Sequence, residues 1–279
     1  MTSSGSAAAF TAARDEGRAA LVGYLPVGHP DVPTSCQAFR ALCGVGGEHP
    51  GVDLVEIGMP YSDPVMDGTT VQRATTRALA AGVRTRDIFT AVEAVAETGT
   101  PAVVMIYWNL VERYGVDAFA RDLAQAGGSG LITPDLTPDE AEPWIAASEA
   151  HDLDRIFLVS PSSSDERLAM TLQQCRGWVY ATALMGVTGT RNAVSSMAPD
   201  LVARIRATDP EMLVGVGLGV ANGEQAGEVG SFADGVIVGS ALVQTLLEAQ
   251  DAGRPDDLSA LHRVVADLAD GVRRGRRSV

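Results

Sequence analysis

The sequence predicts an α/β protein: a TIM-type (β/α)8 barrel, in which eight parallel strands alternate with helices, with an extra helix at the N-terminus. Two observations predict this fold. Short runs rich in Val, Ile and Leu recur along the chain, as parallel strands covered on both faces require. Amphipathic stretches separate these runs, and eight strands that are each followed by a helix favour a closed barrel over an open doubly wound sheet.

The elements follow from hydrophobic periodicity and from helix-starting residues. A leading helix is predicted over residues 7–17. The predicted strands cover residues 20–25, 52–57, 102–106, 130–132, 156–159, 178–181, 213–216 and 235–238. Helical patterns between them cover residues 34–43, 85–98, 116–126, 138–150, 164–175 and 198–207. Several of these helical patterns open on Thr, Ser, Pro or Asp, which favour the first turn of a helix.

The chain of 279 residues is predicted to form one domain over residues 1–279, because α/β barrels of roughly 250 residues commonly fold as a single unit. Residues 1–18 contain the N-terminal helix, and residues 270–279 form a basic C-terminal tail. This tail is interpreted as a solvated helix end, since cations are favoured at the C-terminus of a helix.

Composition excludes several kinds of chemistry. The chain has no lysine, whereas Schiff-base and pyridoxal-phosphate chemistry require a lysine amine. The four histidines lie far apart without metal-ligand spacing, so no metal site is predicted. Cys36, Cys43 and Cys175 form no CxxC pair and are expected to be unpaired buried thiols. Carboxylates are therefore the candidates for acid/base work.

The charge of the chain disfavours polyanionic partners. The formal net charge is −14, whereas nucleic acids and anionic membranes select basic surfaces. The apolar stretches are shorter than the ~20 residues that cross a bilayer, and the N-terminus lacks the basic region of a secretory signal. We expect a cytoplasmic protein with no nucleic-acid or membrane partner. A small anionic substrate is compatible with this charge, because backbone N–H groups at helix ends bind phosphate.

Two carboxylates beside the second predicted strand are the leading catalytic candidates. In VEIGMPYSDPVMDG, Glu56 lies near the end of the strand and Asp67 in the following loop, and active sites of barrels form at that end. Since strand residues alternate faces, Glu56 points into the barrel if Val55 and Ile57 point toward the helices. An unpaired carboxylate there is costly, which indicates either catalysis or a glutamate satisfied by neighbouring hydroxyls.

Glycine-rich segments follow the last three predicted strands. Three residues separate Tyr180 from the segment LMGVTGTRN, and its glycines suit either a mobile lid or an ordinary turn. Gly217 follows the seventh strand, and Gly239 and Ser240 follow the eighth. Barrels frequently bind phosphate there, through loop amides and a helix N-terminus. We expect a phosphate site in which Ser240 caps the helix and offers its hydroxyl.

The ordered set of motifs resembles one family. EIGMPYSDPVMDG, YWNLVERYG, GLITPDLTPDE, FLVSPSS, GVTG and ADGVIVGSALV occur in the order found in tryptophan synthase alpha subunits, and the resemblance runs from Leu21 to Val243. It implies a lyase that cleaves indole-3-glycerol phosphate to indole and glyceraldehyde 3-phosphate in tryptophan biosynthesis. It also implies no cofactor in this chain, and a pyridoxal-phosphate beta subunit as partner in an alpha2beta2 heterotetramer.

The resemblance also implies roles for individual residues. Glu56 matches the acid/base catalyst, and Asp67 matches the aspartate that contacts the indole nitrogen. Burial of Glu56 is expected to favour its protonated form and to bring its pKa toward the working pH. The remaining matches are Tyr24, Tyr107 and Tyr180 in the indole pocket, Thr188 in the lid, and Gly189, Gly217, Gly239 and Ser240 at the phosphate.

The sequence departs from the family pattern at several loops. Thr69 and Thr137 stand where many relatives have proline, and His29 replaces an acidic residue that is expected near the barrel mouth. The loop GLGVANGEQA keeps its glycines but alters the side chains beside the phosphate. These changes leave both carboxylates in place, so they bear on loop motion and partner docking more than on the reaction.

Three alternatives share parts of this pattern. A stand-alone indole-3-glycerol phosphate lyase would use the same catalytic residues and release free indole to another pathway. A sugar-phosphate isomerase or epimerase would share the phosphate site without producing indole. A catalytically silent barrel that acts only as an allosteric binding subunit is disfavoured by the presence of both Glu56 and Asp67.

Overall fold

The computed structural model describes residues 5–182 and 191–275, excluding the side chains of residues 191–196. The strands of the described residues are β1 (Ala20–Pro26), β2 (Leu54–Gly58), β3 (Ala102–Met105), β4 (Gly130–Ile132), β5 (Asp154–Ile156), β6 (Leu158–Val159), β7 (Val179–Thr182), β8 (Val214–Gly217) and β9 (Gly235–Val238). All pairings between neighbouring strands are parallel, in the order β5-β4-β3-β2-β1-β9-β8-β7-β6.

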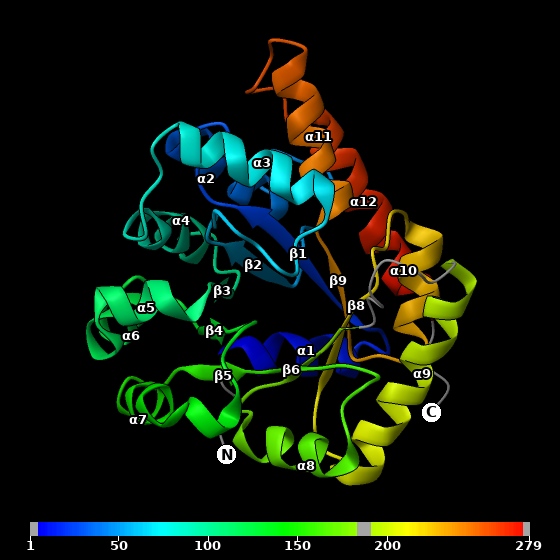
Figure 1. The fold of residues 1–279 in the computed structure, drawn as a ribbon. Helices are drawn as coiled ribbons and strands as arrows, with labels where there is room; N and C mark the ends of the chain where they lie inside the picture. Colours follow the sequence, from blue (N-terminus) through cyan, green and yellow to red (C-terminus); the bar gives the residue numbers. More distant parts are fainter. Residues whose placement is uncertain (1–4, 183–190, 276–279) are drawn as a thin grey trace.

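Helices surround this ring of strands, and α1 crosses its centre (Figure 1). The described helices are α1 (Gly5–Asp15), α2 (Val32–Leu42), α3 (Thr69–Ala80), α4 (Asp87–Ala96), α5 (Trp108–Tyr114), α6 (Val116–Gln125), η1 (Pro138–Glu140), α7 (Glu142–Ala150), α8 (Asp165–Gln174), α9 (Arg191–Thr208), α10 (Gly223–Gly230), α11 (Ser240–Asp251) and α12 (Ser259–Arg274). The predicted TIM-type barrel with an extra N-terminal helix is therefore confirmed.

The fifth predicted strand, residues 156–159, needs correction. The extended segment begins at Asp154 and is divided at Phe157 into β5, which pairs with β4, and β6, which pairs with β7. Side chains still alternate across the division, because Ile156 and Leu158 face the barrel interior while Phe157 packs on the helix side. One continuous segment thus closes the ring by pairing with a different neighbour through each half.

The other strand predictions differ from the structure by two residues or fewer at each end, and two coincide with it, β4 and β9. One helix start behaves as predicted and another begins earlier than predicted. Ser164, which opens the predicted helix over residues 164–175, accepts a hydrogen bond from the Arg167 N–H at the start of α8. Helix α2 begins at Val32 rather than at Thr34, and its cap is Asp31, which accepts a hydrogen bond from the Thr34 N–H.

The basic tail predicted over residues 270–279 is wrong in part. Helix α12 continues to Arg274, and Val272 is buried, so residues 270–274 belong to a packed helix. Arg273 and Arg274 lie in the last turn of α12, which agrees with the interpretation of these cations as favourable charges at the C-terminus of a helix. Residues 276–279 lie outside the described residues.

Aromatic side chains close the amino end of the barrel. Phe10 of α1 is completely buried, and its ring stacks on Trp178 at a centroid distance of 5.1 Å. A Cβ at Gly235 would lie 2.4 Å from the Phe10 ring, so glycine is required where this ring enters the barrel. Side chains therefore fill the barrel interior at its amino end.

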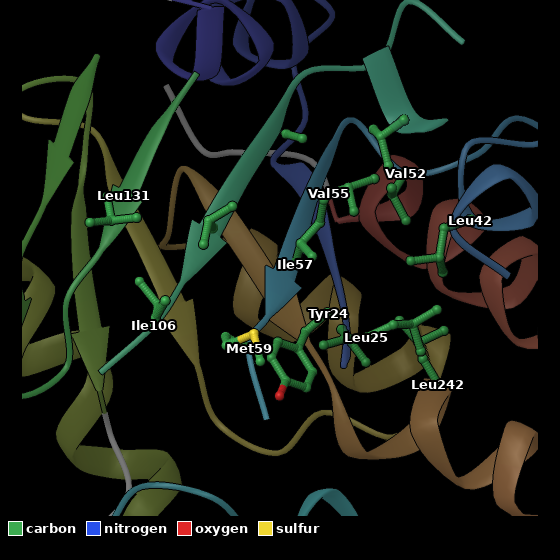
Figure 2. Close-up of a cluster of buried hydrophobic side chains, with 14 of the residues drawn as sticks. Tyr24, Leu25, Leu42, Val52, Val55, Ile57, Met59, Ile106, Leu131 and Leu242 are labelled. Atoms are coloured by element: carbon green, nitrogen blue, oxygen red, sulfur yellow. The ribbon is translucent and has the colours of Figure 1, made fainter. Parts of the chain in front are cut away.

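A second apolar layer joins the strands to the surrounding helices. Figure 2 shows part of this layer, with Val55 and Ile57 on the strand side and Leu42 and Leu242 on the helix side. Because Val55 and Ile57 both face outward, the intervening residue faces the barrel interior, as the alternation of strand residues predicts.

The structure also bears on the cysteines and on the absence of long apolar stretches from the sequence. Of the cysteines, all of them free, Cys36 is buried, but Cys43 and Cys175 are only half-buried, which corrects the expectation of three buried thiols. Within residues 5–182 and 191–275, the helices are too short or too polar to traverse a lipid bilayer.

We predict that Phe10→Ala lowers the free energy of unfolding by about 3–5 kcal/mol, because it leaves a cavity between α1 and the barrel floor. Chemical denaturation measures this loss. Arg14→Ala is the control, since Arg14 is exposed on the same helix. Equal stability of the two variants would contradict the role of Phe10 as the plug of the barrel.

Candidate active site

A cavity of about 210 Å³ opens at the carboxyl ends of the strands. This is the end at which barrel enzymes build their active sites. The side chains and glycines that line it come from β1, β2, β3, β6, β7, β8 and β9 and from the segments that follow β2, β8 and β9. They are Tyr24, Glu56, Met66, Asp67, Gly68, Val71, Met105, Leu158, Tyr180, Thr182, Gly217, Gly219, Ile237, Gly239 and Ser240.

Glu56 projects from the middle of β2 into this cavity. Its side chain is 2% exposed, and its Oε2 atom has no hydrogen-bond partner among the described residues. Burial raises the pKa of Glu56 to about 8, and the nearby Asp67 carboxylate contributes to this rise. The predicted direction of the shift is confirmed, so Glu56 carries a proton at neutral pH and can act as an acid.

Asp67 enters the cavity from the loop between β2 and α3. The loop is held by its backbone, since the Gln72 side chain donates a hydrogen bond to the Asp67 carbonyl oxygen at 2.8 Å. The Val65 and Met66 N–H groups also donate to the Tyr107 hydroxyl, at 2.7 and 3.3 Å. Burial raises the pKa of Asp67 to about 6, so at neutral pH Asp67 is mostly ionised while Glu56 is mostly protonated.

Two tyrosines complete the polar wall, and each occupies space that a glycine on the next strand leaves free. A Cβ at Gly58 would lie 2.3 Å from the Tyr24 hydroxyl, and a Cβ at Gly217 would lie 2.7 Å from the Tyr180 hydroxyl. Burial raises the pKa of both phenols well above the ordinary value, and the charges of the two carboxylates add to the rise. Both phenols therefore stay protonated, so each hydroxyl can donate one hydrogen bond and accept others through its oxygen.

The opposite side of the cavity is lined by backbone rather than by charge. Gly217 and Gly219 follow β8, and Gly239 and Ser240 follow β9, where α11 begins. Gly219 has φ +69°, a conformation that glycine adopts without strain. Exposed N–H groups and the positive end of α11 give this side the character of an anion site.

The prediction that Ser240 caps this helix is wrong. Gly239 occupies the cap position of α11, and no side chain caps it there. Ser240 is the first helical residue, so its hydroxyl is not used to satisfy an N–H of its own helix. It remains directed to the cavity that it lines.

The structure brings most of the predicted site residues together. Glu56, Asp67, Tyr24, Tyr180, Gly217, Gly239 and Ser240 line the one cavity. Tyr107 does not line it, but its hydroxyl and its stacking on Tyr61 at 4.3 Å hold the loop that carries Asp67. Thr188 and Gly189 lie outside the described residues.

The prediction omitted several lining residues that carry apolar side chains. Met105, Leu158 and Ile237 form the floor of the cavity from three different strands. Each of them is an inward-facing residue near a strand end, so strand alternation contains the signal that would have found them. Met66 and Val71 belong to the Asp67 loop and to α3, where no comparable periodicity points into the barrel.

His29 follows the carboxyl end of β1, near the barrel mouth as predicted. Its side chain is fully buried, and it does not line the cavity. Burial lowers the pKa of His29 to about 4, with a smaller contribution from Arg77, so the imidazole is neutral at neutral pH. Thr69 begins α3 and Thr137 precedes η1, so both threonines stand at helix starts.

The described part of the chain holds no group of His, Cys, Asp and Glu side chains arranged to bind a metal. The described lining residues also include no arginine or histidine. The arrangement offers one protonated carboxyl, one carboxylate and a backbone-lined anion site around an apolar floor. It can move a proton and stabilise a developing positive charge on an apolar substrate that is anchored by an anionic group.

Comparison with known proteins gives a consistent result. The family model for the tryptophan synthase alpha chain matches residues 10–272. Tryptophan synthase alpha chains from Mycobacterium marinum and Salinispora tropica are each 60% identical to this chain, over 95% of it and 93% and 96% of their own lengths. A solved tryptophan synthase structure from Mycobacterium tuberculosis contains a chain with a TM-score of 0.88 and 55% identity, over 97% of this chain and 99% of that one.

The raised pKa of Glu56 predicts that this carboxyl destabilises the fold as pH rises. Below the ordinary glutamate pKa of 4.5, both the folded and the unfolded state hold the proton; between pH 4.5 and about 8, mainly the folded state does. Stability is therefore lost through this window, by about 5 kcal/mol, and Glu56→Gln should abolish that loss.

Denaturant titrations of both proteins across this pH range measure the difference. Asp67→Asn is the matched comparison. The pH range over which Asp67 affects stability runs from 3.8 to about 6, so it ends at a lower pH than that of Glu56. An unchanged pH dependence in Glu56→Gln would show that the carboxyl is not held protonated by the fold.

Proposed function

Because the chain belongs to the tryptophan synthase alpha chain family, we propose that its cavity carries out the alpha reaction of tryptophan biosynthesis with Glu56 and Asp67 as the reacting groups. The protein is a lyase, and the reaction is the retro-aldol cleavage of indole-3-glycerol phosphate to indole and glyceraldehyde 3-phosphate. One observation carries the residue assignment: a buried carboxyl group, Glu56, and a half-buried one, Asp67, have separated pKa values and face one cavity whose other side has the character of an anion site.

Glu56 supplies and recovers one proton in the proposed cycle. The protonated carboxyl donates to C3 of the indole ring, which converts indole into a leaving group. The bond between C3 and the glycerol carbon then breaks, and its electron pair returns to the ring. The hydroxyl of the departing carbon becomes a carbonyl and loses its proton to the Glu56 carboxylate, so the enzyme ends the cycle as it began.

Asp67 stabilises the charge that this step creates. When C3 is protonated, positive charge develops toward the indole nitrogen. An ionised carboxylate that accepts the N–H of that nitrogen stabilises the charge through a charge-assisted hydrogen bond. The pKa of about 6 keeps Asp67 ionised at neutral pH, as this role requires.

The glycine-lined side of the cavity binds the substrate phosphate in this proposal. Gly217, Gly239 and Ser240 present backbone N–H groups, a hydroxyl and the start of α11. Gly189 and Thr188 are assigned to the phosphate and to the lid by the family resemblance. Phosphate held there fixes the glycerol chain, so that both carboxyl groups meet their atoms.

The beta subunit of tryptophan synthase is the partner of this chain. We propose an alpha2beta2 heterotetramer in which pyridoxal phosphate belongs to the beta subunit. The absence of lysine from this chain supports that division, because pyridoxal phosphate is held through a lysine amine. We also propose a cytoplasmic location and a single domain over residues 1–279; the barrel from β1 to β9 supports the single domain.

The decisive experiment supplies indole-3-glycerol phosphate to the purified chain and follows indole release. We predict that Glu56→Gln and Asp67→Asn each lower turnover at least ~100-fold, because each removes a group that acts in the transition state. Circular dichroism should show both variants folded. Near-normal turnover in either variant would refute the role of that residue.

The same assay with added beta subunit tests the partnership. Indole formation should increase when the beta subunit is present, and the two chains should elute together in gel filtration. No change in rate and no co-elution would favour a chain that releases free indole by itself.

The two carboxyl groups also predict a bell-shaped pH dependence of kcat/KM. Activity should rise as Asp67 ionises at about 6 and fall as Glu56 loses its proton at about 8. Initial rates at substrate concentrations well below KM measure both limbs. A profile that is flat across both values would contradict the assignment of one ionised and one protonated carboxyl.

A further inference from the structure

The segment between β8 and α10 supplies two of the glycines that line the cavity, Gly217 and Gly219. It ends at Asn222, the cap residue of α10. In the proposed function, backbone N–H groups on this side of the cavity bind the substrate phosphate. The affinity for phosphate therefore depends on how firmly the backbone of this segment is held.

Hydrogen bonds tie the far end of this segment to the first turn of α10. The Asn222 side chain accepts the Gln225 N–H at 3.0 Å, and the Gln225 side chain accepts the Ala221 N–H at 2.8 Å. The near end is fixed as well, because Gly217 is the last residue of β8 and pairs with both neighbouring strands, β7 and β9. Only residues 218–220 lie between these two anchors, so the position of the first turn of α10 sets their path.

The first turn of α10 is held in turn by the last helix of the chain, α12. The Asp267 carboxylate accepts the Gly223 N–H at 2.7 Å. Gly223 is the first helical residue of α10, so its N–H is one of those that a helix cannot pair within itself. A charged acceptor strengthens such a bond, and negative charge is favourable at the start of a helix. Asp267 thus fixes α10 from another helix.

Glycines bring the two helices close enough for this bond, and α12 lies beside α10 in Figure 1. A Cβ at Gly271 would lie 2.1 Å from the Gly223 carbonyl oxygen, and a Cβ at Gly275 would lie 2.3 Å from the Gly227 carbonyl oxygen. Glycines four residues apart on each helix therefore meet backbone to backbone. The start of α10 cannot move toward α12, and its bond to Asp267 opposes movement away.

We propose that Asp267 is a positioning residue for phosphate binding. It holds the first turn of α10, and through that turn it holds residues 217–222 in the geometry that receives a phosphate group. Asp267 does not line the cavity, so it acts through the Gly223 backbone and not by contact with the substrate. The inference rests on the phosphate site of the proposed function.

Asp267→Ala removes the acceptor and should weaken the binding of inorganic phosphate roughly tenfold. Isothermal titration calorimetry measures this affinity without turnover. In the kinetic assay, KM for indole-3-glycerol phosphate should rise by a similar factor while kcat changes less than about twofold, because the phosphate contact is shared by ground state and transition state. A loss of stability alone would instead lower the active fraction, and thus the apparent kcat, at an unchanged KM.

Two variants separate the hydrogen bond from the charge. Asp267→Asn keeps an oxygen acceptor without the charge and should recover most of the phosphate affinity. Asp270→Ala is the matched control, since it removes a carboxylate that is exposed on the same helix, and its affinity should equal that of the unmodified chain. Unchanged affinity in Asp267→Ala, or an equal loss in Asp267→Asn or Asp270→Ala, overturns the proposal.

Gly271→Ala tests the same contact from the other side. Its Cβ would meet the Gly223 carbonyl oxygen, so the start of α10 must shift and phosphate affinity should again fall. If this variant does not fold, the Asp267 variants decide. Phosphate binding that follows these expectations in a chain that forms no indole would refute the proposed function and leave the role of Asp267 standing. A chain that binds no phosphate would overturn that role.

Discussion

The structure of the site depends on one constraint: two carboxyl groups share one cavity whose described lining has no cation to neutralise them. Ionising both groups there would be costly, because burial penalises charge and the two charges repel. The protein meets this constraint by keeping the deeper group, Glu56, protonated and by allowing the shallower group, Asp67, to ionise. The division of labour between an acid and an electrostatic partner therefore follows from depth in the barrel.

Glycine positions set the room in which this pair works. Gly58 and Gly217 admit the phenols of Tyr24 and Tyr180 at the mouth. The same arrangement recurs deeper in the barrel, where Gly215 faces the Trp178 ring at 2.7 Å from a would-be Cβ. Aromatic rings over glycines thus fill the interior from the amino end up to the carboxyl groups. This filling ends below the carboxyl ends of the strands, so the cavity remains where the loops after β2, β8 and β9 meet.

The alternation of strand residues made it possible to predict from the sequence where the side chain of Glu56 points. The pattern around Glu56 sufficed to place its side chain in the barrel, and the ordered strands and helices sufficed for the fold. Two features could not be read in the same way. The change of pairing at Phe157 leaves the alternation intact, so periodicity carries no sign of it. The cap position of α11 depends on the backbone at Gly239, where one residue decides whether Ser240 caps the helix or faces a ligand.

The absence of a cation among the described lining residues also links substrate binding to the proton on Glu56. In the proposed reaction the phosphate is bound by neutral donors, so its charge is not cancelled and adds to that of Asp67. Both charges favour the protonated form of Glu56, and bound substrate therefore raises the pKa of Glu56 further. By linkage, a protonated Glu56 binds the substrate more tightly than an ionised one. The electrostatic arrangement that binds the substrate therefore also keeps on Glu56 the proton that is transferred to C3 of the indole ring.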